Sequence, residues 1–318
     1  MVLLPTRDSA INIEKKLEYE NLARFFCSGV SCISAGFITN PIDVIKIRLQ
    51  LDNQLSENKN IFYKRKYNGF IRSAIYIFKN EGFGGLYKGV TASIMRESIY
   101  STFRLGAYEP VKSKLGATSI YAPLWKKVIA GAIVGAIGSA IANPTDLVKI
   151  RMQAQEKLKP GECARYRHTF AAFQDILTNE GILGMWRGVG PTVLRAAILT
   201  ASQIPSYDHS KSILLRNNFM EEGFKLHLIA SVTAGLITAL VTSPVDVIKT
   251  RIMNERIVRN KNLVYTSAYS CFVKILNTEG LLGFYKGLVP NWVRIGPHTT
   301  ISFLIFERLR SWVGLKPI

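Results

Sequence analysis

The chain has 318 residues, 48% of them hydrophobic, and its 41 Lys and Arg against 22 Asp and Glu give a formal net charge of +19. The basic residues lie singly or in pairs beside apolar stretches, which favours an anionic membrane as the partner and disfavours nucleic acid. Four cysteines and four histidines are scattered along the chain. Their spacing predicts neither a disulfide framework nor a metal site, and no nucleophile–base motif, P-loop or dinucleotide fingerprint indicates an enzyme or a bound cofactor.

Long apolar stretches are the first structural feature along the chain. Three of them contain no Asp, Glu, Lys or Arg: 25–42, 128–145 and 226–245. Each has about the 17–25 residues that a membrane-spanning helix needs, and each is rich in Gly, Ala and Ser, which allows close helix packing in lipid. Three further helices are predicted over 90–111, 189–210 and 288–306, where a few internal charges would give a poor hydropathy score.

A threefold internal repeat organises these stretches. The pattern Pro-x-Asp-x-x-Lys-x-Arg begins at Pro41, Pro144 and Pro244, and a Glu-Gly pair follows in each copy, with its glutamates 99 residues apart. Length differences between the copies fall between this pattern and the next tyrosine, so the helices keep their length. We therefore expect three two-helix repeats, six spanning helices and threefold pseudosymmetry.

Three copies of Pro-x-Asp-x-x-Lys at this period resemble the mitochondrial carrier family over nearly the whole chain. The resemblance implies an all-α membrane protein, with six tilted helices around a central cavity and three short amphipathic helices on the matrix side. It also implies a monomer in the mitochondrial inner membrane, with both termini in the intermembrane space. The expected division is an N-terminal extension over 1–20 and repeats over 21–116, 117–217 and 218–318.

The first helix of each repeat carries one acid and one base on the same face, because residues three apart are neighbours on a helix. With threefold symmetry, the expected pairs join neighbouring repeats: Asp43 with Lys149, Asp146 with Lys249 and Asp246 with Lys46. The resemblance implies that this ring is a matrix gate, braced by Gln50 and Gln153, with Met253 in the third brace position. The prolines before the acids are expected to kink these helices.

The second helix of each repeat contains an aromatic residue, an acid and a base in the same order. The neighbour rule pairs Glu109 with Lys211, Asp208 with Arg310 and Glu307 with Lys112, beside the aromatic residues Tyr108, Tyr207 and Phe306. This second ring is expected to be a cytoplasmic gate, since opening one ring while closing the other is the alternating-access logic of transporters. Ordinary surface pairs within one helix are the alternative.

Arginines 96, 195 and 294 occupy equivalent positions between the two expected gates. A charged side chain at the bilayer centre costs at least about 2.5–3.5 kcal/mol, so we expect the three guanidiniums to face a water-filled cavity. Converging guanidiniums bind carboxylate or phosphate groups. The resemblance places substrate contacts at Arg96, Arg195 and Arg294, and Arg104 adds positive charge to the same cavity.

Glu97 has no counterpart in the other repeats, where Ala196 and Ile295 hold its place. Two roles are open. It can pair with Arg104, two turns away on nearly the same face, and neutralise a surplus charge. It can instead reach across the cavity to Arg195 or Arg294, compete with the substrate and carry a proton when the anion moves.

Within the family, the chain resembles the branch that contains the oxoglutarate and dicarboxylate carriers and the uncoupling proteins. The segment RIGPHTTISF (294–303) and Gln203 are similar to the dicarboxylate-type carriers, whereas uncoupling proteins tend to have an acid at the position of Gly36. Glu97 departs from those carriers, which usually have glutamine there. The expected function is exchange of a small anionic metabolite such as malate, oxoglutarate, succinate, phosphate or sulfate. A proton-conducting uncoupler and a non-transporting membrane protein are the alternatives.

Tyr-Lys-Gly and Trp-Arg-Gly triplets precede the second helix of each repeat and end at Gly89, Gly188 and Gly287. Glycine lets a phosphate approach the amides at a helix N-terminus. Together with the net positive charge, this predicts cardiolipin at three matrix-side sites, as the resemblance also implies. A plain glycine turn beside a basic residue is the alternative.

Overall fold

The computed structural model describes residues 7–52, 67, 69–116, 123–155, 166–216, 224–255, 265 and 267–313, and within these ranges every regular element is helical. The predicted all-α fold is therefore confirmed. In chain order the elements are α1 (Arg7–Leu51), α2 (Phe70–Leu86), α3 (Val90–Lys114), α4 (Leu124–Ile141), α5 (Asn143–Ala154), α6 (Thr169–Met185), α7 (Val189–Arg216), α8 (Phe224–Asn254), α9 (Ala268–Glu279), the 3-10 helix η1 (Leu281–Tyr285) and α10 (Leu288–Trp312).

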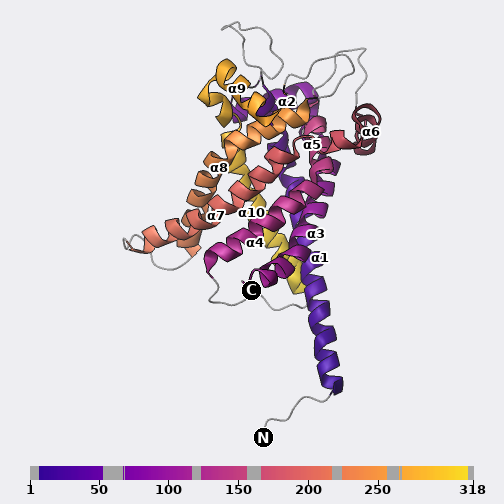
Figure 1. Ribbon diagram of the computed structural model, residues 1–318, viewed down its shortest axis with the longest axis vertical. Coiled ribbons are helices and arrows are strands. Elements are labelled where there is room, and N and C mark those ends of the chain that lie inside the picture. The colour runs from indigo at the N-terminus through magenta and orange to yellow at the C-terminus, as the bar shows by residue number, and fades with distance from the viewer. Residues whose placement is uncertain are drawn as a thin grey trace.

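The elements repeat three times as a long helix, a short helix and a second long helix. The first long helices are α1, the α4–α5 pair and α8, and the second are α3, α7 and α10. The short helices α2, α6 and α9 lie together at the upper end of the bundle in Figure 1. Each repeat contains one segment whose length differs from that in the other repeats. These segments, within 53–66, 156–165 and 256–264, lie outside the described residues.

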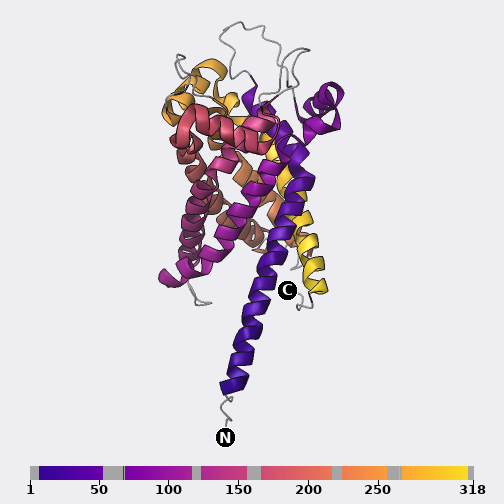
Figure 2. The same ribbon diagram turned by 90° about the vertical axis from the view of Figure 1, so that its right-hand side faces the viewer.

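The start of α1 and the end of α10 lie at the opposite end of the bundle from the short helices (Figures 1 and 2). This agrees with the expectation that both termini face the same compartment. Helix α1 has 45 residues, which corresponds to about 68 Å at 1.5 Å per residue, against a hydrocarbon core of about 30 Å. Its first part extends alone beyond the other helices (Figure 2). From Arg7 onward, the predicted N-terminal extension therefore forms the beginning of α1.

The repeated prolines act differently in the three repeats. Helices α4 and α5 meet at Ala142 with a bend of 63°, directly before Pro144. Proline cannot donate a backbone hydrogen bond and clashes with the preceding turn, which explains a break at this point. Pro41 and Pro244 lie inside α1 and α8, which continue through them as single helices.

The described helices include spans of membrane length. Phe26–Leu51 and Ile229–Asn254 are long and apolar enough to cross a bilayer, and the bent pair of Trp125–Ile141 and Asn143–Ala154 is a third span if it counts as one. On α4, Ile133, Ile137 and Ile141 form an exposed stripe, 39–47% accessible, while Val134 is 1% accessible. Such an apolar stripe suits contact with lipid. Helices α3, α7 and α10 fall short of the same criterion, as their internal charges predict, and their crossing of the membrane stays a prediction.

A glycine in the left-handed region begins each second long helix. Gly89, Gly188 and Gly287 have φ angles of 70°, 78° and 82°, a conformation that costs any other residue energy. A Cβ atom at these positions would also lie only 2.8–3.1 Å from the side chain of Gln153, Met253 or Gln50, respectively. Glycine is therefore required here both by the backbone and by the close approach of the neighbouring repeat.

Candidate functional site

A ring of three ion pairs joins the repeats near the end of the bundle that carries the short helices. Lys149 lies 2.7 Å from Asp43, Lys249 lies 2.6 Å from Asp146, and Lys46 lies 2.8 Å from Asp246, in each case between Nζ and Oδ2. All six side chains are buried. These are the three pairs predicted from the repeat, and they are confirmed. Each lysine comes from the repeat that follows the aspartate, so each pair ties two repeats together.

The three arginines of the predicted substrate site touch the same aspartates. Arg96 Nε lies 2.9 Å from Asp146 Oδ1, Arg294 Nε lies 2.9 Å from Asp43 Oδ1, and Arg195 Nε contacts Asp246 Oδ1. Each arginine comes from the repeat that precedes its aspartate. The triad was expected to lie free between two gates, whereas the structure places it directly on the matrix ring. Each aspartate therefore connects all three repeats, with a lysine on one oxygen and an arginine on the other.

The ring and the triad enclose a small pocket of about 60 Å³. It is lined by the six ring residues and three arginines, together with Ile47, Gln50, Ile150 and Thr250. Isolated buried charges are very costly, so each charge here depends on its partners. Removing a lysine or an arginine would leave its aspartate with one basic partner instead of two, whereas removing an aspartate would take the shared partner from both a lysine and an arginine.

The glutamines expected to brace the ring make other contacts. Gln153 Nε2 donates a hydrogen bond to Asn40 Oδ1 at 3.0 Å and lies 3.5 Å from Ser93 Oγ. Gln50 lines the pocket, and its Oε1 is buried without a hydrogen-bond partner among the described residues. The brace prediction is therefore wrong for Gln153 and without a supporting hydrogen bond for Gln50. Both side chains, and Met253, also pack against the glycine that begins a long helix of a neighbouring repeat.

A second layer of ion pairs lies between the ring and the short helices α2, α6 and α9 and was missed by the sequence analysis. The arginine that ends each motif reaches the glutamate of the Glu-Gly pair in its own repeat: Arg48 with Glu81 at 2.5 Å, Arg151 with Glu180 at 2.5 Å and Arg251 with Glu279 at 2.7 Å. The Nε atoms of the same arginines donate to backbone carbonyls of the next repeat, on Gln153, Met253 and Gln50. The signal for these pairs was that a motif arginine and a Glu-Gly glutamate recur together in all three repeats.

The Glu81 pair lies on α2, outside the spanning segments. Burial by itself raises the pKa of Glu81, but hydrogen bonds from Arg48 and Lys88 outweigh it and lower the pKa from 4.5 to about 2. Lys88 also donates to the carbonyl of Gln155 in the next repeat, at 2.9 Å. Glu81 is therefore ionised at neutral pH and ties α2 to the end of α1 and, through Lys88, to α5.

Only part of the expected cytoplasmic ring can be described. The side chains of Glu109 and Asp208 lie outside the described residues. Glu307 contacts Arg310 of its own helix at 3.6 Å, so the predicted pair with Lys112 is wrong in this conformation. Arg310 lies over the ring of Phe306 at 5.5 Å, and Lys112 lies over Tyr108 at 5.8 Å. Tyr207 and Lys211 are half-buried.

Glu97 is buried on α3 and forms an ion pair with its neighbour Arg96. Neither expected partner is correct: Arg104 is exposed, and the carboxylate contacts neither Arg195 nor Arg294. Arg104 and Gln203 lie eight residues beyond Arg96 and Arg195, about 12 Å further along their helices, and Gln203 is also exposed. These two residues are therefore too far from the triad to share its contacts.

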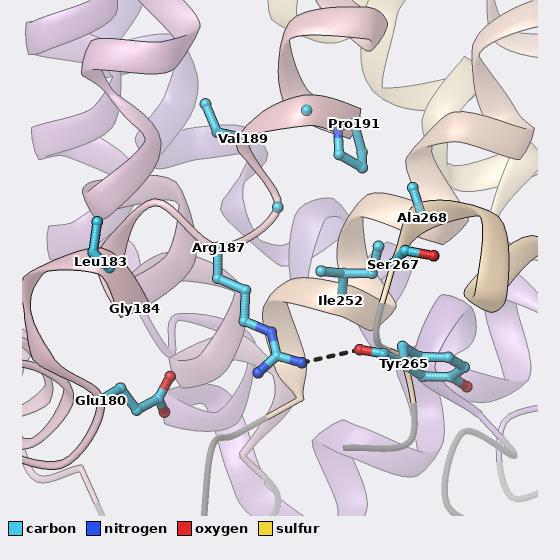
Figure 3. Close-up of a pocket in the computed structure, with 12 residues that line it drawn as sticks. Glu180, Leu183, Gly184, Arg187, Val189, Pro191, Ile252, Tyr265, Ser267 and Ala268 are labelled. Carbon is cyan, nitrogen blue, oxygen red and sulfur yellow. Dashed lines mark hydrogen bonds between the residues drawn. The ribbon is translucent and has the colours of Figure 1, made fainter. Parts of the chain in front are cut away.

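Two of the three predicted lipid positions, Gly188 and Gly287, line surface cavities, and the position at Gly89 stays a prediction. Figure 3 shows a cavity of about 410 Å³ at the start of α7, lined by Gly188, Arg187 and Tyr265 among others. The Arg187 guanidinium donates to the Tyr265 carbonyl at 3.4 Å and pairs with Glu255 at 2.8 Å, and its Nη1 has no hydrogen-bond partner among the described residues. A second cavity of about 210 Å³ lies at Gly287, at the start of α10.

Three pseudosymmetric helical repeats that meet in a buried ring of ion pairs, with arginines on the ring, define a membrane solute carrier. The chain belongs to the mitochondrial carrier family: the model described as "Mitochondrial carrier protein" matches residues 18–119, 121–218 and 221–316. Members of this family are transporters, and the protein is a mitochondrial inner-membrane protein, as the family assignment and its membrane-length helices indicate.

Similar proteins carry two kinds of name. The chain is 44% identical to "Mitochondrial substrate carrier family protein ucpB" of Dictyostelium discoideum, over 93% of this chain and 97% of that protein. It is 36% identical to "Mitochondrial uncoupling protein 2" of Arabidopsis thaliana, over 94% and 96%. It is 37% identical to "Probable mitochondrial 2-oxoglutarate/malate carrier protein" of Dictyostelium discoideum, over 91% and 89%. The names therefore span the two functions that the sequence left open.

Proposed function

We propose that the protein exchanges small dianions, in the first place dicarboxylates such as malate, oxoglutarate and succinate, by alternating access between its two rings. The observation that supports this is the position of the arginine triad. Each guanidinium rests on a ring aspartate, so an incoming carboxylate competes for the same guanidinium as the ring carboxylate. Binding of substrate and opening of the matrix ring are coupled by this competition.

The competition also explains why exchange, rather than free passage, is expected. In the empty carrier, opening the ring would break the three lysine–aspartate pairs and leave each aspartate with its arginine alone, and breaking buried ion pairs is strongly unfavourable. A bound dicarboxylate supplies new partners to the arginines and weakens their hold on the aspartates. A hydrogen bond to a charged group contributes about 1.5–3 kcal/mol, so two substituted contacts are enough to shift the equilibrium toward the matrix-open state.

The named relatives support both this proposal and one alternative. A 2-oxoglutarate/malate carrier is among the similar proteins, at 37% identity. Uncoupling proteins are similar at a comparable level, 36% for uncoupling protein 2 of Arabidopsis thaliana. The alternative is therefore a proton or anion conductor, and the buried Glu97 is the group on the cavity floor that favours it, since a carboxylate can carry a proton.

Cardiolipin is proposed as a structural partner at the two cavities beside Gly188 and Gly287. The first residues of α7 and α10 and the basic residues Arg187 and Lys286 line these cavities, and a helix N-terminus favours phosphate. The Arg187 guanidinium adds a positive charge to the wall of the cavity beside Gly188.

Transport by reconstituted liposomes tests the proposal. Liposomes that contain the purified protein are loaded with unlabelled succinate, malate, oxoglutarate, phosphate or sulfate, and uptake of labelled succinate is measured. Uptake that depends on an internal dianion supports exchange. Uptake that does not depend on the internal anion, together with a proton leak that increases with the amount of protein, would reject exchange and support the uncoupling alternative.

A further inference from the structure

The pocket between the ring and the arginine triad has a net charge that the threefold pattern does not explain. Six basic groups meet there, from Lys46, Lys149, Lys249, Arg96, Arg195 and Arg294. The symmetric acids are Asp43, Asp146 and Asp246, and Glu97 is a fourth. With His298 neutral, the site therefore has a net charge of +2, whereas three identical repeats would give +3. Glu97 alone makes this difference.

The extra carboxylate acts on one arginine of the triad. Arg96 contacts both Glu97 and Asp146. Arg195 and Arg294 each contact one aspartate, and each of those aspartates is shared with a lysine. Arg96 therefore has more anionic partners than the other two and is the least available for a substrate carboxylate.

Glu97 is held in place by the helices around it. A Cβ atom at Gly36 on α1 would lie 3.5 Å from Glu97 Cγ, and no other heavy atom would be within 4 Å of it. On α10, His298 Nδ1 lies 3.4 Å from Thr39 Oγ1 of α1. The charged or titratable groups that act on Glu97 after Arg96 are Arg294, Lys149 and His298. The stem of Glu97 thus packs against α1, while its carboxylate pairs with Arg96.

We propose that Glu97 determines the charge of the anion that the carrier accepts, by selecting doubly charged anions over triply charged ones. This inference rests on the proposed exchange of anions. Two carboxylates match the two available arginines, Arg195 and Arg294, and balance the net charge of +2. A third carboxylate would have to displace Glu97 from Arg96 or remain next to it without a partner.

The size of the effect follows from one unit of charge. At a separation of about 6 Å and an effective dielectric constant between 20 and 80, removing one negative charge changes the relative affinity for a third carboxylate by about threefold to hundredfold. A value of about tenfold is a reasonable expectation for a site that is partly open to water.

The test compares two carboxylates of different charge. Uptake of labelled succinate into succinate-loaded liposomes is inhibited with unlabelled succinate or with tricarballylate, a propane tricarboxylate, and the ratio of the two half-inhibitory concentrations is measured. Because only the ratio is compared between variants, the effect of the larger size of tricarballylate on inhibition cancels. The variant Glu97→Gln is expected to shift the ratio about tenfold in favour of tricarballylate.

A charge-relocation variant is the matched control. Gly36→Asp combined with Glu97→Gln restores the carboxylate from α1, where the added side chain lies against position 97, and is expected to return the ratio to within about threefold of the wild-type value. A ratio for Glu97→Gln within about twofold of the wild type would overturn the inference, even if succinate exchange is normal. Absence of succinate exchange in the wild type would instead reject the proposed function.

A second variant keeps the inference testable if Glu97→Gln cannot be reconstituted. Gly36→Asp alone adds a carboxylate and lowers the net charge to +1, so tricarballylate should compete even less well than in the wild type. The same ratio can be read from the thermal stabilisation of detergent-solubilised protein by each anion, which does not require transport. An unchanged or opposite ratio in Gly36→Asp would contradict the proposal.

Discussion

The pair between Lys46 and Asp246 allows a quantitative test of the matrix gate. The two side chains are buried and 2.8 Å apart, and Lys46 also donates to Asn291 Oδ1 at 2.8 Å. Breaking a buried ion pair by changing one partner costs about 3–5 kcal/mol. Since each 1.4 kcal/mol is a factor of ten in an equilibrium constant, Lys46→Asp or Asp246→Lys should shift the balance between closed and open states by about 100-fold to 4,000-fold, and exchange should fall sharply.

The double swap, Lys46→Asp with Asp246→Lys, should restore only part of the exchange rate. It recreates the pair, but the new lysine at 246 lies next to Arg195, which contacts Asp246 in the wild type. Groups in contact show coupling energies of about 0.5–3 kcal/mol, so we expect a recovery of about tenfold over the worse single variant. Exchange is measured as labelled succinate uptake into loaded liposomes, normalised to reconstituted protein.

A mismatched swap distinguishes a specific pair from a general effect of charge. Lys46→Asp with Asp146→Lys has the same change in composition, but Asp146 pairs with Lys249, so no pair is recreated. The exchange rate of this double variant should be as low as that of the less active of its two single variants. The pairing between repeats would be refuted as the basis of the gate if both double swaps recovered equally, or if the matched swap gave no recovery.

Four further predictions follow from the same structure. Arg294→Ala should abolish exchange while the thermal unfolding temperature stays close to that of the wild type, and near-normal exchange would remove the arginine from the substrate site. The pKa of Glu81 is about 2 in the folded protein and about 4.5 in the unfolded chain, so its ion pair should stabilise the protein fully above pH 5 and lose this effect as the pH falls toward 2. The unfolding temperature of Glu81→Gln should therefore fall less between pH 5 and pH 3 than that of the wild type. An equal fall in both proteins would contradict this prediction. Cardiolipin should raise the unfolding temperature of the detergent-solubilised protein more than a neutral lipid does, and Arg187→Ala should reduce the difference. Since Glu97 is ion-paired, exchange should not depend on an imposed pH gradient; a dependence that Glu97→Gln abolishes would instead identify Glu97 as a proton carrier.

The sequence by itself was enough for the architecture and for the ring of ion pairs. A motif that recurs at intervals of about 100 residues predicts three equivalent repeats, and helix geometry puts Asp43 and Lys46 on one face of their helix. Threefold symmetry then predicts that Asp43 pairs with the lysine of a neighbouring repeat. These conclusions depend only on spacing along the chain, and spacing can be read directly from the sequence.

Only the tertiary structure decided what the long side chains do. Arg96 was expected in an open cavity, yet it reaches Asp146 and Glu97, and Gln153 bonds to Asn40 instead of bracing the ring. Arginine and glutamine side chains have several rotatable bonds, so their partners depend on how far apart and at what tilt the helices cross, which spacing along one chain does not specify. The conformational state, with the matrix ring closed, is likewise a property of the packed bundle, because the same residues serve both states.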